Sequence, residues 1–108
     1  MNVTTHNDDS TLDNSLTCLQ GYIDTSYDSL VQRFGQPMPG FDKTDAEWVL
    51  KTEDGTLITI YNWKNGPNYN GKYGTPVRQI TRWNVGGHSR LAVIALRELM
   101  ATSIAEAA

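Results

Sequence analysis

Residues 46–63 read AEWVLKTEDGTLITIYNW, and this stretch decides the fold because it has the pattern of a β-hairpin. Two runs rich in β-branched and aromatic residues flank the pair Asp54 and Gly55, which is a strong signal for a tight turn. We expect the two strands over residues 46–52 and 56–63. Successive side chains of a strand point to opposite faces. In the second strand we expect the core face to carry Ile58, Ile60 and Asn62, and the other face to carry Leu57, Thr59, Tyr61 and Trp63.

The chain before the hairpin has the pattern of a short strand followed by a short helix. We expect the strand over residues 16–23, after which Thr25 or Ser26 can cap the helix. The apolar residues of this helix recur at helical spacing: Tyr27, Leu30, Val31 and Phe34. Gly35 provides a left-handed stop, and the two prolines that follow prevent continuation of the helix.

The chain after the hairpin predicts a loop, a strand and a helix. Residues 64–77 are dense in Gly, Asn, Pro and Tyr, so they form either a functional loop or a tolerated insertion. We expect a strand over residues 77–85, in which the spacing from Ile80 to Trp83 requires a bulge or a different register. A helix over about residues 89–103 is apolar around more than one stripe, which indicates burial across the sheet or contact with a second copy.

Together these elements predict one α+β domain over residues 16–108, in the order β-α-β-β-β-α. We expect a mostly antiparallel sheet with two helices on one face. The opposite face then leaves Tyr61, Trp63 and Arg82 for a ligand or a homo-oligomer contact. Residues 1–15 are polar and acidic, and we expect them to form a flexible tail.

The composition of the chain narrows the functional classes. The formal net charge of the 108 residues is −3, which argues against general nucleic-acid binding, but residues 55–97 hold Lys and Arg without a single Asp or Glu. Cys18 is the only cysteine, so an internal disulfide is impossible, and no targeting segment or apolar run of about 20 residues is present. We therefore expect a soluble cytoplasmic protein that does not enter membranes.

Residues 83–90 read WNVGGHSR and allow two interpretations. In the first, Gly86 and Gly87 form a tight turn between strand and helix, and His88 or Ser89 caps the helix. In the second, the glycines turn backbone N–H groups toward a phosphate. Further donors in that case come from His88, Ser89, Arg90, Arg82 and Arg78. The stretch lacks the full glycine pattern and the Lys of a P-loop, so a capped turn explains the glycines taken alone.

The aromatic residues point to a ligand that carries a base. We expect Trp48 and Trp83 in the core, and Trp63 as an exposed ring near Tyr61 and Tyr69. Bases stack on such rings, and neighbouring Lys and Arg residues can neutralise phosphate. An anionic, nucleotide-like small molecule therefore fits better than a long polymer.

Catalysis is poorly supported by the sequence. His88 is the only histidine of the expected domain, and the carboxylate pairs at 45 and 47 and at 53 and 54 flank strands and turns. We expect a binding protein with no catalytic residues, no metal and no cofactor. A small phosphate-ester hydrolase is the alternative if the protein is an enzyme.

Five blocks of sequence, taken in order, resemble a widespread group of small proteins encoded in bacteriophage genomes. The blocks are GYIDTSYDSLVQRFGQP (21–37), DAEW (45–48), DGT (54–56), IYNWK (60–64) and WNVGGHS (83–89). The resemblance runs from about Gly21 to Leu99, so the acidic first 15 residues depart from it.

This resemblance implies a binding role in phage counter-defence. One such role is a sponge, a homo-oligomer that encloses a nucleotide signal of the host's immune system. Another is a protein–protein inhibitor of a host defence protein, such as a CRISPR-Cas or other nuclease complex. A sponge is expected to use aromatic and basic groups, whereas an inhibitor more often presents a large acidic or apolar surface. The basic second half of the chain favours the sponge.

Overall fold

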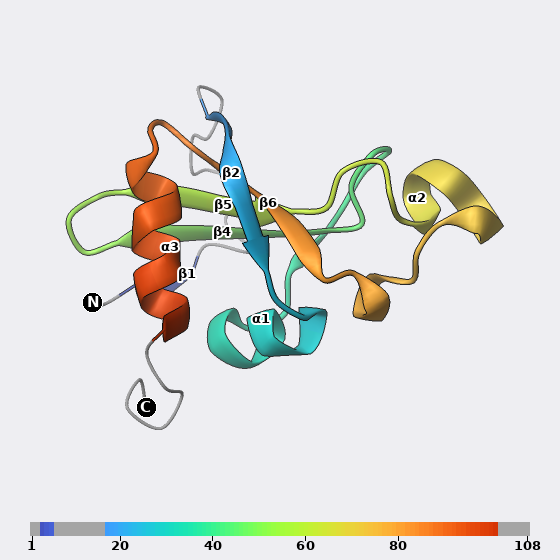
Figure 1. The fold of residues 1–108 in the computed structure, drawn as a ribbon, viewed down its shortest axis with the longest axis horizontal. Helices are drawn as coiled ribbons and strands as arrows, with labels where there is room; N and C mark the ends of the chain where they lie inside the picture. The colour runs from blue at the N-terminus through green and yellow to red at the C-terminus, as the bar shows by residue number, and fades with distance from the viewer. Residues whose placement is uncertain (1–2, 6–16, 102–108) are drawn as a thin grey trace.

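The computed structural model describes residues 3–5 and 17–101, which form a six-stranded sheet with helices (Figure 1). The strands are β1 (Val3–Thr5), β2 (Cys18–Asp24), β3 (Met38–Pro39), β4 (Ala46–Thr52), β5 (Leu57–Tyr61) and β6 (Arg82–Gly87). The α-helices are α1 (Tyr27–Phe34), α2 (Pro67–Asn70) and α3 (Leu91–Ala101). Two 3₁₀ turns, η1 (Gly71–Tyr73) and η2 (Val77–Gln79), lie between α2 and β6.

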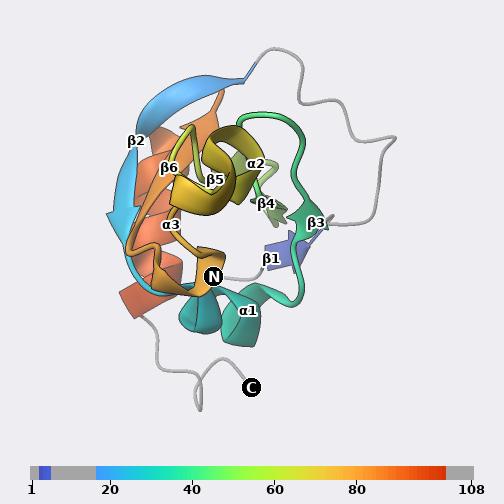
Figure 2. The same ribbon diagram turned by 90° about the vertical axis from the view of Figure 1, so that its right-hand side faces the viewer.

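The sheet has the strand order β1-β4-β5-β6-β2, and every pair in it is antiparallel. The two-residue β3 pairs with the start of β4, beside the segment of β4 that pairs with β1. Figure 2 shows the sheet curling from β2 through β6, β5 and β4 toward β1. The predicted fold class, an α+β domain on a mostly antiparallel sheet, is confirmed.

The hairpin β4–β5 forms where the sequence predicts it. Trp48 pairs with Ile60 and Leu50 with Ile58, and all four side chains are fully buried. The turn places Gly55 at φ 91°, a left-handed conformation that residues with a Cβ rarely adopt. The predicted core face of β5 is therefore correct, although β5 ends at Tyr61, two residues earlier than expected.

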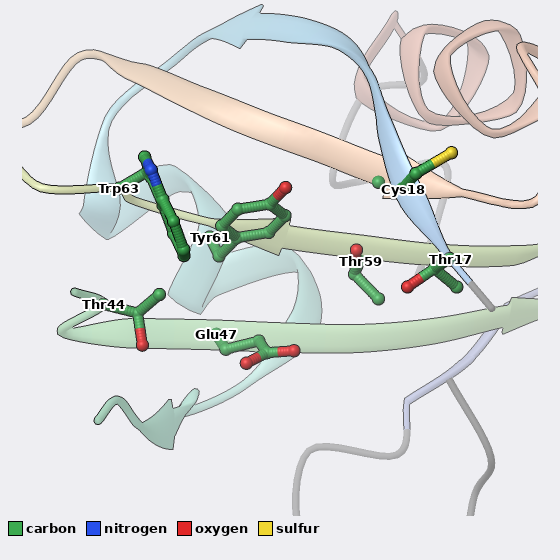
Figure 3. A pocket seen from close by; sticks show the side chains of 8 residues that line it. Thr17, Cys18, Thr44, Glu47, Thr59, Tyr61 and Trp63 are labelled. Carbon is green, nitrogen blue, oxygen red and sulfur yellow. The ribbon is translucent and has the colours of Figure 1, made fainter. Parts of the chain in front are cut away.

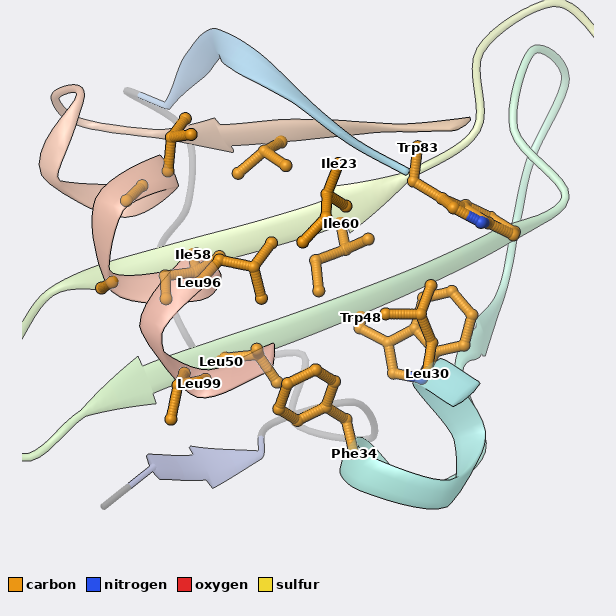
Figure 4. Close-up of a cluster of buried hydrophobic side chains, with 14 of the residues drawn as sticks. Ile23, Leu30, Phe34, Trp48, Leu50, Ile58, Ile60, Trp83, Leu96 and Leu99 are labelled. Carbon is orange, nitrogen blue, oxygen red and sulfur yellow. The ribbon is translucent and has the colours of Figure 1, made fainter. Parts of the chain in front are cut away.

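The core lies between one face of the sheet and the two longer helices, α1 and α3 (Figure 4). Helix α1 contributes Leu30 and Phe34, and helix α3 contributes Leu96 and Leu99. The rings of Trp48 and Trp83 meet edge to face at 5.4 Å between centroids, and both are inaccessible to solvent. The placement of these two tryptophans in the core is confirmed.

Helix α1 begins and ends at the predicted signals. The Oγ of Ser26 accepts a hydrogen bond from the N–H of Ser29, and Asp28 lies in the first turn, where it complements the helix dipole. At the other end Gly35 has φ 82°, and its N–H donates to the carbonyl of Val31.

The first residues correct the prediction of a flexible tail. Val3–Thr5 is a strand on the edge of β4, and Val3 packs against the core. The tail prediction was wrong for these three residues, because they pair with Thr52, Lys51 and Leu50 of β4 and Val3 is partly buried against the core. The remainder of 1–15 lies outside the described residues.

The last strand also differs from the prediction, because β6 begins at Arg82 and not at residue 77. Val77–Gln79 is a 3₁₀ turn, and Ile80 is buried after it without belonging to a strand. Ile80 and Trp83 would point to opposite faces of a single strand, yet both are buried. They can both face the core because Ile80 lies before β6 begins. The only register shift in the β2–β6 pair lies on the partner strand, between Leu19 and Gly21.

Candidate functional site

The face of the sheet opposite α1 and α3 carries a row of polar and aromatic side chains. Glu47 of β4 pairs with Tyr61 of β5, Tyr61 with Asn84 of β6, and Asn84 with Tyr22 of β2. Directly paired residues share a face of the sheet, and here their neighbours Trp48, Ile60 and Trp83 point to the core. The row therefore crosses four strands on what we call the outer face.

A hollow of about 220 Å³ opens on the outer face. Figure 3 shows its side chains on β4, β5 and β2 and on the residues that adjoin these strands, Thr44, Trp63 and Thr17. Its lining combines two aromatic rings, three threonines, a carboxylate, a thiol and a glycine: Tyr61, Trp63, Thr17, Thr44, Thr59, Glu47, Cys18 and Gly86. No Lys or Arg is among these lining residues.

Two aromatic rings form adjoining walls of the hollow. Tyr61 and Trp63 lie at 6.2 Å between ring centroids with their planes at 80°. Trp63 is 47% exposed, so its ring is available to a ligand, as predicted. The ammonium of Lys43 lies 5.6 Å from the centre of the Trp63 ring, which places a positive charge beside the aromatic wall.

Glu47 supplies the only carboxylate of the hollow lining. Burial raises the pKa of this carboxyl above its usual value, because the surrounding protein removes water from the charged form. None of the described residues donates a hydrogen bond to this carboxylate or forms an ion pair with it. The group is therefore partly dehydrated and uncompensated within the described part of the chain.

Tyr61 stays protonated at neutral pH. Burial raises the pKa of its hydroxyl, a hydrogen bond with Asn84 partly opposes this, and the charge of Glu47 adds to the increase. The ring therefore presents a neutral wall with a polar tip.

Gly86 forms part of the hollow for a reason that the sequence did not suggest. A Cβ on Gly86 would lie 2.4 Å from Oγ1 of Thr59 and 3.4 Å from Cε1 of Tyr61. At Gly87 a Cβ would lie 2.5 Å from the Cβ of Ala92 and 2.9 Å from the carbonyl oxygen of Leu57. Both glycines are buried in β6. Gly86 allows β5 side chains to pack closely on β6, and Gly87 allows Ala92 of α3 to do so.

The predicted turn at the two glycines is therefore wrong. Neither Gly86 nor Gly87 has positive φ, and the chain leaves the sheet only at His88. Ser89 does accept a hydrogen bond through its Oγ from the N–H of Leu91, so it caps α3 as predicted. His88, Ser89 and Arg90 are exposed at this end of β6.

The structure divides the predicted site residues into separate groups. The six residues of β6 span roughly 20 Å, and they separate the Ser89 end of the strand from the Arg82 end, where Trp63 lies. Tyr61, Trp63 and Gly86 line the hollow together. His88, Ser89, Arg90 and Gly87 do not line it, so the aromatic rings and the helix terminus do not form one site.

The arginines and Tyr69 lie outside the hollow. Arg82 is on the outer face, but its guanidinium forms an ion pair with Asp24 at 2.8 Å and lies over the ring of Tyr22. Arg78 is exposed in η2. Tyr69 is on α2, with the ammonium of Lys64 5.7 Å from the centre of its ring.

A buried amide holds the loop that follows Trp63. The side-chain oxygen of Asn62 accepts hydrogen bonds from the N–H groups of Asp45 and Ala46 at 2.7 and 3.2 Å. Its side-chain nitrogen donates to Asp45 at 2.7 Å and to Asn65 at 3.0 Å. The carboxylate of Asp45 in turn accepts from the N–H of Asn68. Asp45 is thus a structural residue, which argues against an acid–base role in a pair with Glu47.

Two residues of this region could have been found from the sequence. Asn62 is a polar residue on the predicted core face, and such a residue requires internal hydrogen bonds. Glu47 alternates with Ala46 and Trp48, which places a carboxylate on the outer face beside Tyr61. Sequence reasoning considered Glu47 only as an acid or base and missed its place in the hollow.

Comparison with known proteins adds no family assignment. No protein-family model and no curated protein shows significant similarity to this chain. Within residues 3–5 and 17–101, no group of three or more His, Cys, Asp or Glu residues could hold a metal ion. Across the same residues, no helix is long and apolar enough to cross a membrane.

Proposed function

We propose that this protein binds a nucleotide-type small molecule without converting it, and that the base of the ligand enters the hollow on the outer face. The observation that carries the proposal is the pair of rings of Tyr61 and Trp63, which stand at 80° to each other around an open space of about 220 Å³. Aromatic walls of this kind stack on bases.

The volume of the hollow supports a base as the inserted group. Pockets that enclose a whole drug-sized ligand measure roughly 300–1,000 Å³, so the hollow is too small for a complete nucleotide. The sugar and phosphate then remain outside the hollow. The ammonium of Lys43, 5.6 Å from the centre of the Trp63 ring, brings a positive charge to this side of the hollow.

The biological role that we propose follows from the resemblance to phage proteins. A phage protein that sequesters a nucleotide signal of the host's immune system needs affinity for the signal and no catalytic residues. We further propose that it acts as a homo-oligomer, since partner subunits can close over the groups of the ligand that the hollow leaves outside. Inhibition of a host defence protein by direct contact is the alternative.

Calorimetric titration of the full chain tests the proposal. The ligands are the four ribonucleoside monophosphates, cyclic dinucleotides and ADP-ribose. We expect at least one of them to bind with a saturable heat and to change the fluorescence of Trp63, the exposed tryptophan. Native mass spectrometry of the same mixtures measures the number of subunits and of bound nucleotides.

A matched pair of variants locates the binding site. Trp63→Ala removes a wall of the hollow and should abolish binding with the circular dichroism unchanged, because this ring is half exposed. Tyr73→Ala removes a ring that is 85% exposed and that also has a lysine ammonium, that of Lys72, over its face. Tyr73 does not line the hollow, so this variant should leave binding unchanged. Failure of every nucleotide to bind would reject the proposal and favour a protein partner.

A further inference from the structure

The carboxylate of Glu47 restricts which base the hollow can accept. An ionised carboxylate only accepts hydrogen bonds, and it has two oxygens that can accept side by side. Glu47 is partly dehydrated by its surroundings, and none of the described residues compensates the charge. A dehydrated charge without a partner is unfavourable, so the bound ligand gains most if it brings N–H donors to this group.

We propose that the hollow selects guanine among the nucleobases, with the carboxylate of Glu47 accepting hydrogen bonds from N1–H and from the 2-amino group while the ring lies against Tyr61 and Trp63. This inference rests on the proposed function and specifies the ligand of the same site. Guanine alone among the common bases carries two adjacent donors on one edge, which match the two oxygens of a carboxylate as an Arg fork does.

The other bases match this carboxylate less well. Adenine and cytosine present one amino donor next to a ring nitrogen that is an acceptor, so the second oxygen of Glu47 would face a lone pair. Uracil presents its single N–H between two carbonyl oxygens, which the carboxylate repels. A site built to accept hydrogen bonds rejects ligands that lack the donors, because its polar group is then left buried and unpaired.

The remaining lining is compatible with the opposite edge of guanine. Thr44 and Thr59 line the same hollow. Oγ1 of Thr44 is hydrogen-bonded to the backbone of Phe41, so the hydroxyl of Thr59 is the one that can donate to O6 or N7 of the base. Gly86 keeps that side of the hollow open, since a Cβ there would meet both Thr59 and Tyr61. A hydroxyl turns to suit its partner, so the contact with Thr59 adds affinity while Glu47 sets the choice of base.

The test compares guanosine monophosphate with inosine monophosphate, which differs only by loss of the 2-amino group, and with the adenosine and uridine monophosphates. Calorimetry on the full chain should show guanosine monophosphate binding about five- to a hundredfold more tightly than inosine monophosphate. The adenosine and uridine nucleotides should bind more weakly than guanosine monophosphate. The comparison of guanosine with inosine monophosphate removes the 2-amino donor from the ligand, so it needs no variant protein.

Glu47→Gln provides the reciprocal test. Glutamine has the same shape but replaces one acceptor oxygen with a donor amide, so guanosine monophosphate should lose its advantage over inosine monophosphate. Glu53→Gln neutralises an exposed carboxylate at the far end of the same hairpin and should retain the advantage. Equal binding of the two nucleotides by the unmodified protein, or an advantage that persists in Glu47→Gln, overturns the guanine assignment alone. Binding of none of these four nucleotides also overturns the guanine assignment, and the proposed function falls with it only if the cyclic dinucleotides and ADP-ribose fail to bind as well.

Discussion

Gly86 shows how a single missing Cβ shapes the outer face. The residue has an ordinary extended backbone in β6, so its glycine identity reflects the space between β6 and β5. Thr59 of β5 would lie 2.4 Å from a Cβ at this position, a separation that real Cβ atoms essentially never show. A motif with paired glycines therefore has a packing explanation here, and phosphate binding is not needed to account for it.

Gly86→Ala should destabilise the protein by about 1–3 kcal/mol, the range for adding a methyl group to a packed site. The clash is with Oγ1 of Thr59, so the two positions should be coupled. Chemical denaturation of Gly86→Ala, Thr59→Ala and the double variant measures this coupling. We expect the double variant to be more stable than the sum of the single effects predicts. Simple additivity would show that the added methyl group finds space elsewhere.

Glu47 links the proposed binding role to the pH dependence of stability. Burial raises the pKa of its carboxyl in the folded state above the value of about 4.3 of an unfolded chain. The folded state thus binds more protons than the unfolded state between these two pKa values. The contribution of Glu47 to stability is full below the unfolded pKa, and it is lost as pH rises through the folded pKa.

Glu47→Gln should therefore raise the free energy of unfolding at pH 7, by no more than about 1 kcal/mol, because it removes a poorly hydrated charge. At pH 3 the glutamate is protonated and the two proteins should be equally stable. Urea titrations at the two pH values measure the difference. A variant that is less stable than the unmodified protein at pH 7 would mean that the charge has a favourable partner in the folded state.

At the scale of elements, hydrogen bonds hold the first residues of the loop after β5. Asn62 is fully buried and joins the start of β4 to Asn65, and Asp45 extends the connection to α2. Gly66 packs so closely on Asp45 that a Cβ would lie 1.9 Å from its carboxylate. These contacts fix the backbone on both sides of Trp63, and the aromatic wall of the hollow depends on them.

Asn62→Ala should destabilise the protein by about 2–4 kcal/mol, since it leaves the N–H groups of Asp45 and Ala46 and the carboxylate of Asp45 without their partner. Asn70→Ala removes a single hydrogen bond to the carbonyl of Lys64 and should cost about 1 kcal/mol or less. Thermal unfolding of the two variants measures this contrast. Similar losses in both would show that water replaces the contacts of Asn62.

The elements that were predicted correctly are those with local signals. The Asp54-Gly55 turn fixed the β4–β5 hairpin, and Ser26 and Gly35 fixed both ends of α1. The start of β6 was missed because residues 77–81 have strand-like composition, while the 3₁₀ turn over Val77–Gln79 is closed by local hydrogen bonds from Gln79 to Pro76 and from Ile80 to Val77. After the turn, the carbonyl of Thr81 accepts a hydrogen bond from the N–H of Thr25, just before β6 begins.

The candidate site was predicted in part for the same reason. Alternation along β5 placed Tyr61 and Trp63 on the face away from the core, and both line the hollow. Register between strands was not available from one sequence, so the distance between Trp63 and Ser89 along β6 could not be anticipated. His88, Ser89 and Arg90, which follow the paired glycines in sequence, were therefore grouped with Tyr61 and Trp63, although these three residues do not line the hollow.

At the scale of the whole molecule, β1 completes the sheet by covering part of an edge. Val3, Thr4 and Thr5 pair with Thr52, Lys51 and Leu50 of β4, while β3 covers the opposite end of that strand. An uncovered strand edge is a template for pairing with another chain. The first residues of the protein therefore protect the sheet as well as adding to it.

Deletion of residues 1–5 should lower the free energy of unfolding by about 1–2 kcal/mol, as expected for loss of a partly buried Val and a short strand. It should also increase self-association, because it exposes the edge of β4 between Leu50 and Thr52. Denaturant titration and light scattering after size exclusion measure the two effects. Val3→Ser keeps the strand but removes its apolar contact, so it should reproduce part of the loss in stability without the self-association. A truncated protein that is as stable and as dispersed as the full chain would show that β1 does not contribute to the sheet in solution.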